Sequence, residues 1–120
     1  MDLILASQST TRRRILSCAH ISATSMSPQI DEEGITRSLA AEQAMPRDIA
    51  DTLAEHKARK ISIKNPQSWV IGCDQILAFE GEVFGKPRTL DDLKQCLTRL
   101  SGKTHRLITA NVIYQNTKPM

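Results

Sequence analysis

Hydroxyl and guanidinium side chains gather near the start of the chain. Ser7-Gln8-Ser9-Thr10-Thr11 follows the short apolar run 3–6 and leads into Arg12-Arg13-Arg14. We predict a strand, a polar turn and a helix N-terminus, because Ser and Thr favour the N-cap. Hydroxyls and arginines around a helix N-terminus would grip a phosphate. The alternative is that the hydroxyls only cap the helix and the arginines are solvated, although positive charge in a first turn opposes the helix dipole.

Asp74 and Lys57 are charged residues at positions that the surrounding sequence predicts to be largely apolar. Asp74 follows the apolar run 69–73, so we predict it at the end of a strand. There a carboxylate can hold a divalent metal or accept a proton from water, or it can simply cap the next turn. Lys57 falls on the inward stripe of a helix predicted over 46–61. It either meets an anion there or extends to the surface with its stem packed.

Two further motifs carry charge, each with a plain structural alternative. Lys86 stands between Gly85 and Pro87, and an ordinary turn is the commoner explanation for such a triplet. Glu32 belongs to Asp31-Glu32-Glu33, which is more often a solvated helix start than a metal site. A nucleophilic role for Cys73 is weak, because alternation along a strand turns Cys73 and Asp74 to opposite faces.

The elements that must position these side chains alternate between strand and helix. We predict strands at 3–6, 21–25, 69–73, 76–79, 83–84 and 105–114, and helices at 12–19, 35–40, 46–61 and 90–100. The last helix is amphipathic, with leucines at 90, 93, 97 and 100. This alternation predicts an α/β fold. Without a linker or repeat, residues 1–120 are expected to form one domain.

Composition excludes several classes of protein. Sixteen basic and thirteen acidic residues give a net charge of only +3, and four aromatic residues offer almost no platform for stacking bases, so we expect no nucleic-acid partner. No apolar run approaches the roughly 18 residues of a membrane span, so we expect no membrane partner. Three scattered cysteines argue against a disulfide framework and favour a reducing cytoplasm.

The order of the motifs resembles the Maf family of nucleoside triphosphate pyrophosphatases. The resemblance covers essentially all 120 residues through LILASQSTTRRRIL, IDEE, DIADTLAEHKA, VIGCDQIL, GEVFGKP and LSGKTHRLIT. It implies a cytoplasmic homodimer that uses Mg²⁺ or Mn²⁺ to split a nucleoside triphosphate into the monophosphate and pyrophosphate. The implied fold is α/β, similar to the inosine triphosphate pyrophosphatases, with a twisted mixed sheet flanked by helices and a central cleft.

The resemblance also implies a role for each candidate residue. Asp74 would be the proton acceptor that activates water, and Glu32 and Asp74 would contact the metal. The phosphate chain would be bound by Ser7, Ser9, Arg12, Arg13, Lys57 and Lys86. Gln75 is like the residue found in the branch associated with modified substrates such as 7-methyl-GTP. The sequence does not decide which base is preferred.

The family pattern continues beyond what this chain contains. Further strands, a glycine-rich stretch and a closing helix have no counterpart here, so the 120 residues match the N-terminal portion of the family fold. Two interpretations follow. The chain is a nucleoside triphosphate pyrophosphatase, or it is a truncated, non-catalytic module that binds a nucleotide or a partner.

Overall fold

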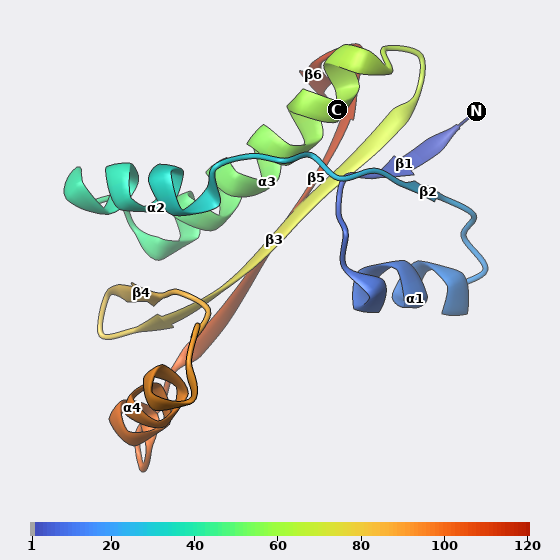
Figure 1. Ribbon diagram of the computed structural model, residues 1–120. Coiled ribbons are helices and arrows are strands. Elements are labelled where there is room, and N and C mark those ends of the chain that lie inside the picture. The colour runs from blue at the N-terminus through green and yellow to red at the C-terminus, as the bar shows by residue number, and fades with distance from the viewer. Residues whose placement is uncertain (1) are drawn as a thin grey trace.

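The computed structural model describes residues 2–120 and has a mixed α/β architecture, as predicted (Figure 1). The strands are β1 (Leu3–Leu5), β2 (Thr24–Ser25), β3 (Trp69–Phe79), β4 (Glu82–Phe84), β5 (Arg106–Gln115) and β6 (Lys118–Pro119). The helices are α1 (Thr10–Cys18), α2 (Glu32–Ala41), α3 (Pro46–Lys64) and α4 (Leu90–Leu100). Every predicted segment takes its predicted helical or strand form, except that the two strands predicted at 69–73 and 76–79 are one strand, β3, and β6 is an additional strand.

The six strands form one mixed sheet around the long β3–β5 pair. The strand order is β2-β1-β3-β5-β6, and β4 pairs with β3 beside this path. β1 runs parallel to β2 and β3, whereas the β3–β5, β3–β4 and β5–β6 pairs are antiparallel. β5 occupies one edge of β3, so β1 and β4 share the other. β1 pairs with 69–71 and β4 with 77–79, so no described strand covers 72–76 on that edge.

The predicted strand end at Asp74 is wrong. Residues 69–73 and 76–79 belong to one continuous strand, and Asp74 lies in its middle. β5 explains the continuity, because it pairs with β3 without interruption from Val70 to Ala78. Gln75, which is exposed, is accommodated by a hydrogen bond from its Nε2 to Thr109 Oγ1 of β5 at 2.9 Å. Two polar residues therefore do not end this strand.

α3 covers one face of β3 at very close range. A Cβ at Gly72 would lie 2.7 Å from Ala58 Cβ and would also meet the backbone oxygen of Ala54. The absence of a side chain at Gly72 thus lets the helix approach the strand. One hydrophobic cluster lies on each side of this contact, the first around Ala58 and Val70 and the second around Ala54 and Ile76.

Much of the apolar surface outside α3 is uncovered within the described chain. α4 forms as an amphipathic helix, yet Leu90 is 66% and Leu97 57% exposed. Leu107 and Ile113 on β5 are also exposed, on the sheet face that points away from α3. Among residues 2–120, no helix combines the length and apolar character needed to cross a membrane.

Candidate functional site

The candidate site lies where the edge of β3 is open between β1 and β4. Ser7 and Ser9 follow the end of β1, and Lys86 follows the end of β4. Into the gap between these strands, Arg12 donates a hydrogen bond from Nη1 to the Cys73 backbone oxygen at 3.2 Å. The side chains surround a cavity of about 520 Å³. The topology therefore gathers residues from separate segments at the middle of β3.

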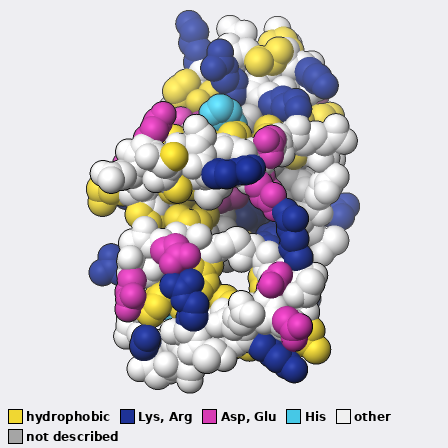
Figure 2. Space-filling model, turned by 60° about the vertical axis from the view of Figure 1, so that its left-hand side comes forward, with side chains coloured by type: hydrophobic (Ala, Val, Ile, Leu, Met, Phe, Trp, Pro, Cys, Tyr) yellow, Lys and Arg dark blue, Asp and Glu magenta, His cyan; other side chains and the backbone are white. Residues whose placement is uncertain are grey.

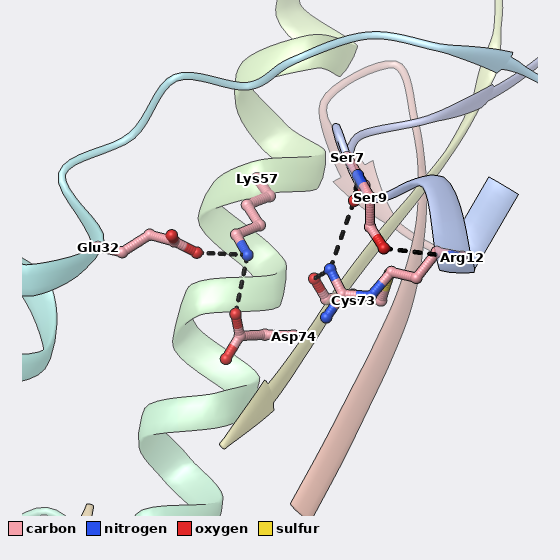
Figure 3. Close-up of polar contacts among 7 residues, drawn as sticks. All are labelled: Ser7, Ser9, Arg12, Glu32, Lys57, Cys73 and Asp74. Carbon is pink, nitrogen blue, oxygen red and sulfur yellow. Dashed lines mark hydrogen bonds and ion pairs between the residues drawn. The ribbon is translucent and has the colours of Figure 1, made fainter. Parts of the chain in front are cut away.

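Ser7, Ser9 and Arg12 form a hydrogen-bonded group at the start of α1 (Figure 3). Ser9 is the N-cap, and its Oγ accepts a hydrogen bond from the Arg12 backbone N–H at 3.2 Å. Ser7 Oγ accepts from the Ser9 backbone N–H at 3.0 Å and from Arg12 Nη1 at 3.4 Å. Capping is therefore a real role of Ser9. Both hydroxyls nevertheless line the cavity, beside a half-buried guanidinium and a helix N-terminus.

Lys57 joins the two candidate metal-binding carboxylates. Its Nζ lies 2.8 Å from Asp74 Oδ1 and 2.5 Å from Glu32 Oε1, and both Lys57 and Asp74 are buried. Burial lowers the pKa of Lys57, but its hydrogen bonds to Asp74 and Glu32 outweigh that effect and raise the pKa above its ordinary value. The side chain is thus a fixed positive charge. Figure 3 shows the second Asp74 oxygen directed away from Lys57.

The three acidic residues at the start of α2 have three different roles. Asp31 is the N-cap, and its Oδ1 accepts a hydrogen bond from the Gly34 backbone N–H at 3.1 Å. Glu32 reaches Lys57 in the site. Glu33 pairs with Arg88 beyond β4, and this hydrogen bond and charge lower the pKa of Glu33. Only Glu32 turns toward the cavity around Asp74.

The carboxylates fit a divalent metal that is shared with a phosphate. No group of three or more His, Cys, Asp or Glu side chains among residues 2–120 is arranged to hold a metal. Mg²⁺, however, is commonly bound through one or two carboxylates together with substrate phosphates. Glu32 and Asp74 already converge on one cation, the Lys57 ammonium. Their hard oxygen donors are the type that Mg²⁺ or Mn²⁺ takes.

Seven of the eight candidate residues line this one cavity. They are Ser7, Ser9, Arg12, Glu32, Lys57, Asp74 and Lys86. Arg13 lies elsewhere, in a separate hollow with His20 and Ile21. The exposed side chain of Lys86 adjoins both this cavity and a larger neighbouring one. Seven candidates therefore lie together and Arg13 lies apart, whereas the chemical role of each residue stays a prediction.

Cys73 lies in a different cavity from the one around Asp74. It lines a hollow with Ile15 and Asn111, as strand alternation predicts. Burial raises the pKa of the Cys73 thiol despite the nearby positive charges of Arg12 and Lys57, so the thiol is held in its neutral form. That form is a poor nucleophile.

The sequence reasoning missed the segment 27–30, which forms part of the cavity wall. Gln29 adopts a positive φ of 47°, and Lys60 Nζ donates a hydrogen bond to its backbone oxygen at 2.5 Å. Ser27-Pro28 signals a turn but gives no indication that the turn returns to the start of α1. Its place depends on β2, which brings the chain alongside β1.

Comparison with known proteins agrees with this arrangement. A family model described as Maf-like protein matches residues 2–120. The chain belongs to the Maf family. The mixed sheet with flanking helices is consistent with the Maf fold, and five of the six motifs that suggested the family contribute residues to the cavity.

Several curated relatives of this Maf chain are pyrophosphatases by name. Nucleoside triphosphate pyrophosphatase 1 of Jannaschia sp. (strain CCS1) is 50% identical over 118 residues, which are 98% of this chain and 60% of the relative. Nucleoside triphosphate pyrophosphatase of Ruegeria pomeroyi is 48% identical over 120 residues, which are all of this chain and 60% of the relative. The 7-methyl-GTP pyrophosphatase of Brucella abortus is 41% identical, with the same coverage of both chains. The chain therefore spans about 60% of the length of these relatives.

Proposed function

We propose that this site hydrolyses nucleoside triphosphates to the monophosphate and pyrophosphate. The observation that carries the proposal is the single cavity shared by the seven candidate residues, which come from five separate parts of the chain. Hydroxyls, a guanidinium and two lysines of this cavity offer donors to a phosphate chain. Its two carboxylates offer a proton acceptor and metal ligands. Relatives whose names state this activity support the proposal.

In the proposed mechanism, each group of the chain has a distinct task. Arg12, Ser7 and Ser9 hold the phosphate chain at the start of α1, and Lys86 neutralises part of its charge. Asp74 accepts a proton from the attacking water through the oxygen that Lys57 leaves free. The water oxygen then bonds to the α-phosphorus, and the bond between this phosphorus and the oxygen that bridges to the β-phosphate breaks. The bridging oxygen leaves as part of pyrophosphate.

A divalent cation belongs to the same proposal. Glu32 and Asp74 would hold it, with the phosphates completing its coordination. When bound, Mg²⁺ or Mn²⁺ polarises a phosphoryl oxygen and neutralises developing charge. Lys57 would then have to release at least part of its contact with the two carboxylates. Its ammonium would be free to turn toward the phosphates.

The test is pyrophosphate release from a panel of triphosphates that includes 7-methyl-GTP, with Mg²⁺ or Mn²⁺ present. Gln75 beside Asp74, and the name of the Brucella relative, are the reasons to include the methylated nucleotide. We expect Asp74→Asn to lower kcat by about 10²- to 10⁴-fold, the usual contribution of a general base. Nucleotide binding by this variant should remain. Undiminished turnover would show that Asp74 is not the proton acceptor.

A second candidate function is nucleotide binding without turnover. The observation that favours it is the Lys57 ammonium, which already contacts both Glu32 and Asp74, the two carboxylates that turnover needs. Calorimetry with a nucleoside triphosphate, combined with pyrophosphate detection over several hours, separates the two functions. Binding with no product supports the binding module, and product that disappears in Asp74→Asn supports the enzyme.

We extend the proposal to a cytoplasmic homodimer, which the family resemblance implies. The exposed leucines of α4 and the exposed β5 residues Leu107 and Ile113 are available for such an association. Sedimentation equilibrium tests it directly. A chain that stays monomeric at high concentration would exclude the dimer for these 120 residues.

A further inference from the structure

A second and larger cleft adjoins the cavity that holds the candidate residues. Its volume is about 1,040 Å³, and it shares Glu32, Asp74, Gln75 and Lys86 with the smaller cavity. The two hollows therefore adjoin at the middle of β3. Figure 2, in which α2 and the β4 hairpin come forward, shows a hollow with hydrophobic side chains along its sides. A ligand held in the smaller cavity would extend naturally into this cleft.

The inner surface of the cleft is apolar. Leu53 and Ile49 of α3 and Ile76 of β3 line it, and all three are buried. The pairing of Ala78 with Val83 places Val83 of β4 on the same sheet face as Ile76 and Asp74. The sheet face that carries Asp74 at the charged cavity thus continues into an aliphatic surface at Ile76 and Val83. Ligand sites of this kind combine apolar walls with a few polar groups that fix orientation.

α2 forms the opposite wall and supplies the polar groups. Glu32, Thr36 and Ala40 all line the cleft at four-residue intervals, so they share one face of the helix. Each step of four residues advances about 6 Å along the helix axis. Glu32 marks the end next to Lys57, and Thr36 places a hydroxyl one turn farther from it. Thr36 therefore faces the part of the cleft beyond the candidate phosphate grip.

An ion pair spans the cleft between its two walls. Glu33 on α2 pairs with Arg88, which follows the β4 hairpin, and both side chains line the cleft. They are largely exposed, at 67% and 71%, so the contact is easily opened and screened by salt. The walls are thus linked across the cleft by a contact that a ligand can displace at little cost.

We infer that the cleft between α2 and β4 takes the nucleoside end of the substrate, with Thr36 facing the sugar or base. The inference rests on the proposed function, since it assumes that the phosphates lie in the smaller cavity. A nucleobase is flat, with apolar faces and polar edges, and the sugar carries hydroxyls, so a nucleoside matches a cleft that combines an aliphatic surface with polar groups. The inference assigns specificity for the base to α2 and the aliphatic surface around Ile76, and the phosphate grip to α1.

The test compares a nucleoside triphosphate with inorganic tripolyphosphate, which has no sugar or base. Both are titrated by calorimetry into the 120-residue chain with Mg²⁺ present. Thr36→Trp would place a large side chain in the cleft at a position that does not line the smaller cavity. We expect it to weaken nucleoside triphosphate binding at least tenfold and to leave tripolyphosphate binding unchanged. The matched control is Ser38→Trp, on the same helix at an exposed position that does not line the cleft, and it should behave as the unmodified chain.

The outcomes separate the inference from the proposed function. If Thr36→Trp lowers the affinity for both ligands equally, or for neither, the inference is overturned, whereas the proposed binding of phosphates in the smaller cavity is unaffected. Equal affinity of the unmodified chain for both ligands would also overturn it, because the nucleoside end would then contribute nothing. Binding of neither ligand would reject the proposed function and the inference together. If Thr36→Trp fails to fold by circular dichroism, Ala40→Trp, at an exposed position one turn farther along the same wall, gives the same comparison.

Discussion

Lys57 Nζ lies 2.8 Å from Asp74 Oδ1, and this buried pair separates the two hydrophobic clusters of the molecule. On α3, Lys57 stands between Ala54, which belongs to one cluster, and Ala58, which belongs to the other. Asp74 is placed in the same way on β3, between Val70 and Ile76. The charged site is therefore built into the helix–strand contact that organises the core, and its geometry depends on that contact.

The first prediction concerns the coupling between these two residues. Breaking a buried ion pair by removing one partner leaves an uncompensated charge, so Lys57→Met should lower the free energy of unfolding by about 3 kcal/mol. The double variant Lys57→Met with Asp74→Asn should lose less than the sum of the two single variants. Urea denaturation of all four chains measures this difference, which we expect to be at least about 1 kcal/mol. If the losses of the two single variants add up to that of the double variant, the contact between Lys57 and Asp74 contributes nothing to the free energy of unfolding.

The second prediction concerns metal binding in the absence of nucleotide. Because the Lys57 ammonium contacts both Glu32 and Asp74, it competes with a divalent cation for the same carboxylates. Lys57→Met should therefore raise the affinity for Mn²⁺ several-fold, as measured by calorimetry. Lys64→Met, at an exposed position of the same helix, is the control and should have no effect. Weaker Mn²⁺ binding by the Lys57 variant would show that the lysine organises the carboxylates rather than competing for them.

The third prediction concerns Gly72, where α3 meets β3. Gly72→Ala brings a Cβ against Ala58 and the Ala54 backbone, neither of which can move without displacing the helix. Overpacking of this kind costs about 2–3 kcal/mol, which thermal or urea unfolding would detect. The displacement should also move Lys57 away from Asp74. Gly85→Ala is the control, since nothing lies within 4 Å of the added Cβ. A neutral Gly72→Ala would show that the helix can shift freely.

The sequence predicted the elements better than the geometry of the site. Hydrophobic periodicity, the hydroxyl residues before α1 and Pro46 at the start of α3 are local signals, and they predicted the helices and most strands, although α1 begins at Thr10 and not at Arg12. Lys57 on an inward stripe was a conflict between charge and position, and of the two alternatives the structure favours the one in which the lysine meets an anion, Asp74. A buried charge of this kind requires a partner.

Non-local pairing explains what the sequence could not predict. The pair Asp74-Gln75 resembles the end of a strand, and only the uninterrupted β5 partner shows that β3 continues. The open edge of β3 arises because β1 and β4 pair with its two ends, a fact of topology with no local pattern. Helix periodicity likewise predicts that α4 is amphipathic but not that Leu90 and Leu97 stay exposed.

The fourth prediction distinguishes the neighbouring arginines of α1. Arg12 lines the cavity and is held by Ser7 and the Cys73 carbonyl, whereas Arg13 lines another hollow. Arg12→Ala should weaken tripolyphosphate binding at least tenfold, and Arg13→Ala should weaken it less. The exposed Arg14 supplies the control variant Arg14→Ala, which should change the affinity only slightly. Equal losses for all three would indicate general attraction by positive charge, and that attraction would disappear as salt is raised.

The fifth prediction concerns the attachment of α4 and its dependence on pH. Arg99 of α4 donates hydrogen bonds from Nη2 and Nη1 to the two Glu82 carboxylate oxygens at 2.8 and 3.3 Å, and it stacks 4.6 Å above the Phe84 ring. The hydrogen bond and positive charge of Arg99 lower the pKa of Glu82 in the folded chain. A group with a lowered folded pKa adds stability above its unfolded pKa and loses it as pH falls through the folded value.

Glu82→Gln should therefore lower Tm at pH 7, and the difference from the unmodified chain should shrink as pH falls below about 4.3, the ordinary value for a glutamate. Differential scanning calorimetry from neutral pH to about pH 3 follows this convergence. Glu80→Gln is the matched control, because Glu80 is exposed in the same hairpin and forms no ion pair with the described residues. A Tm difference for Glu82→Gln that persists unchanged in acid would assign the effect to packing of the side chain instead of its charge. In that case the stack of Arg99 on Phe84 would be what holds α4 to the hairpin.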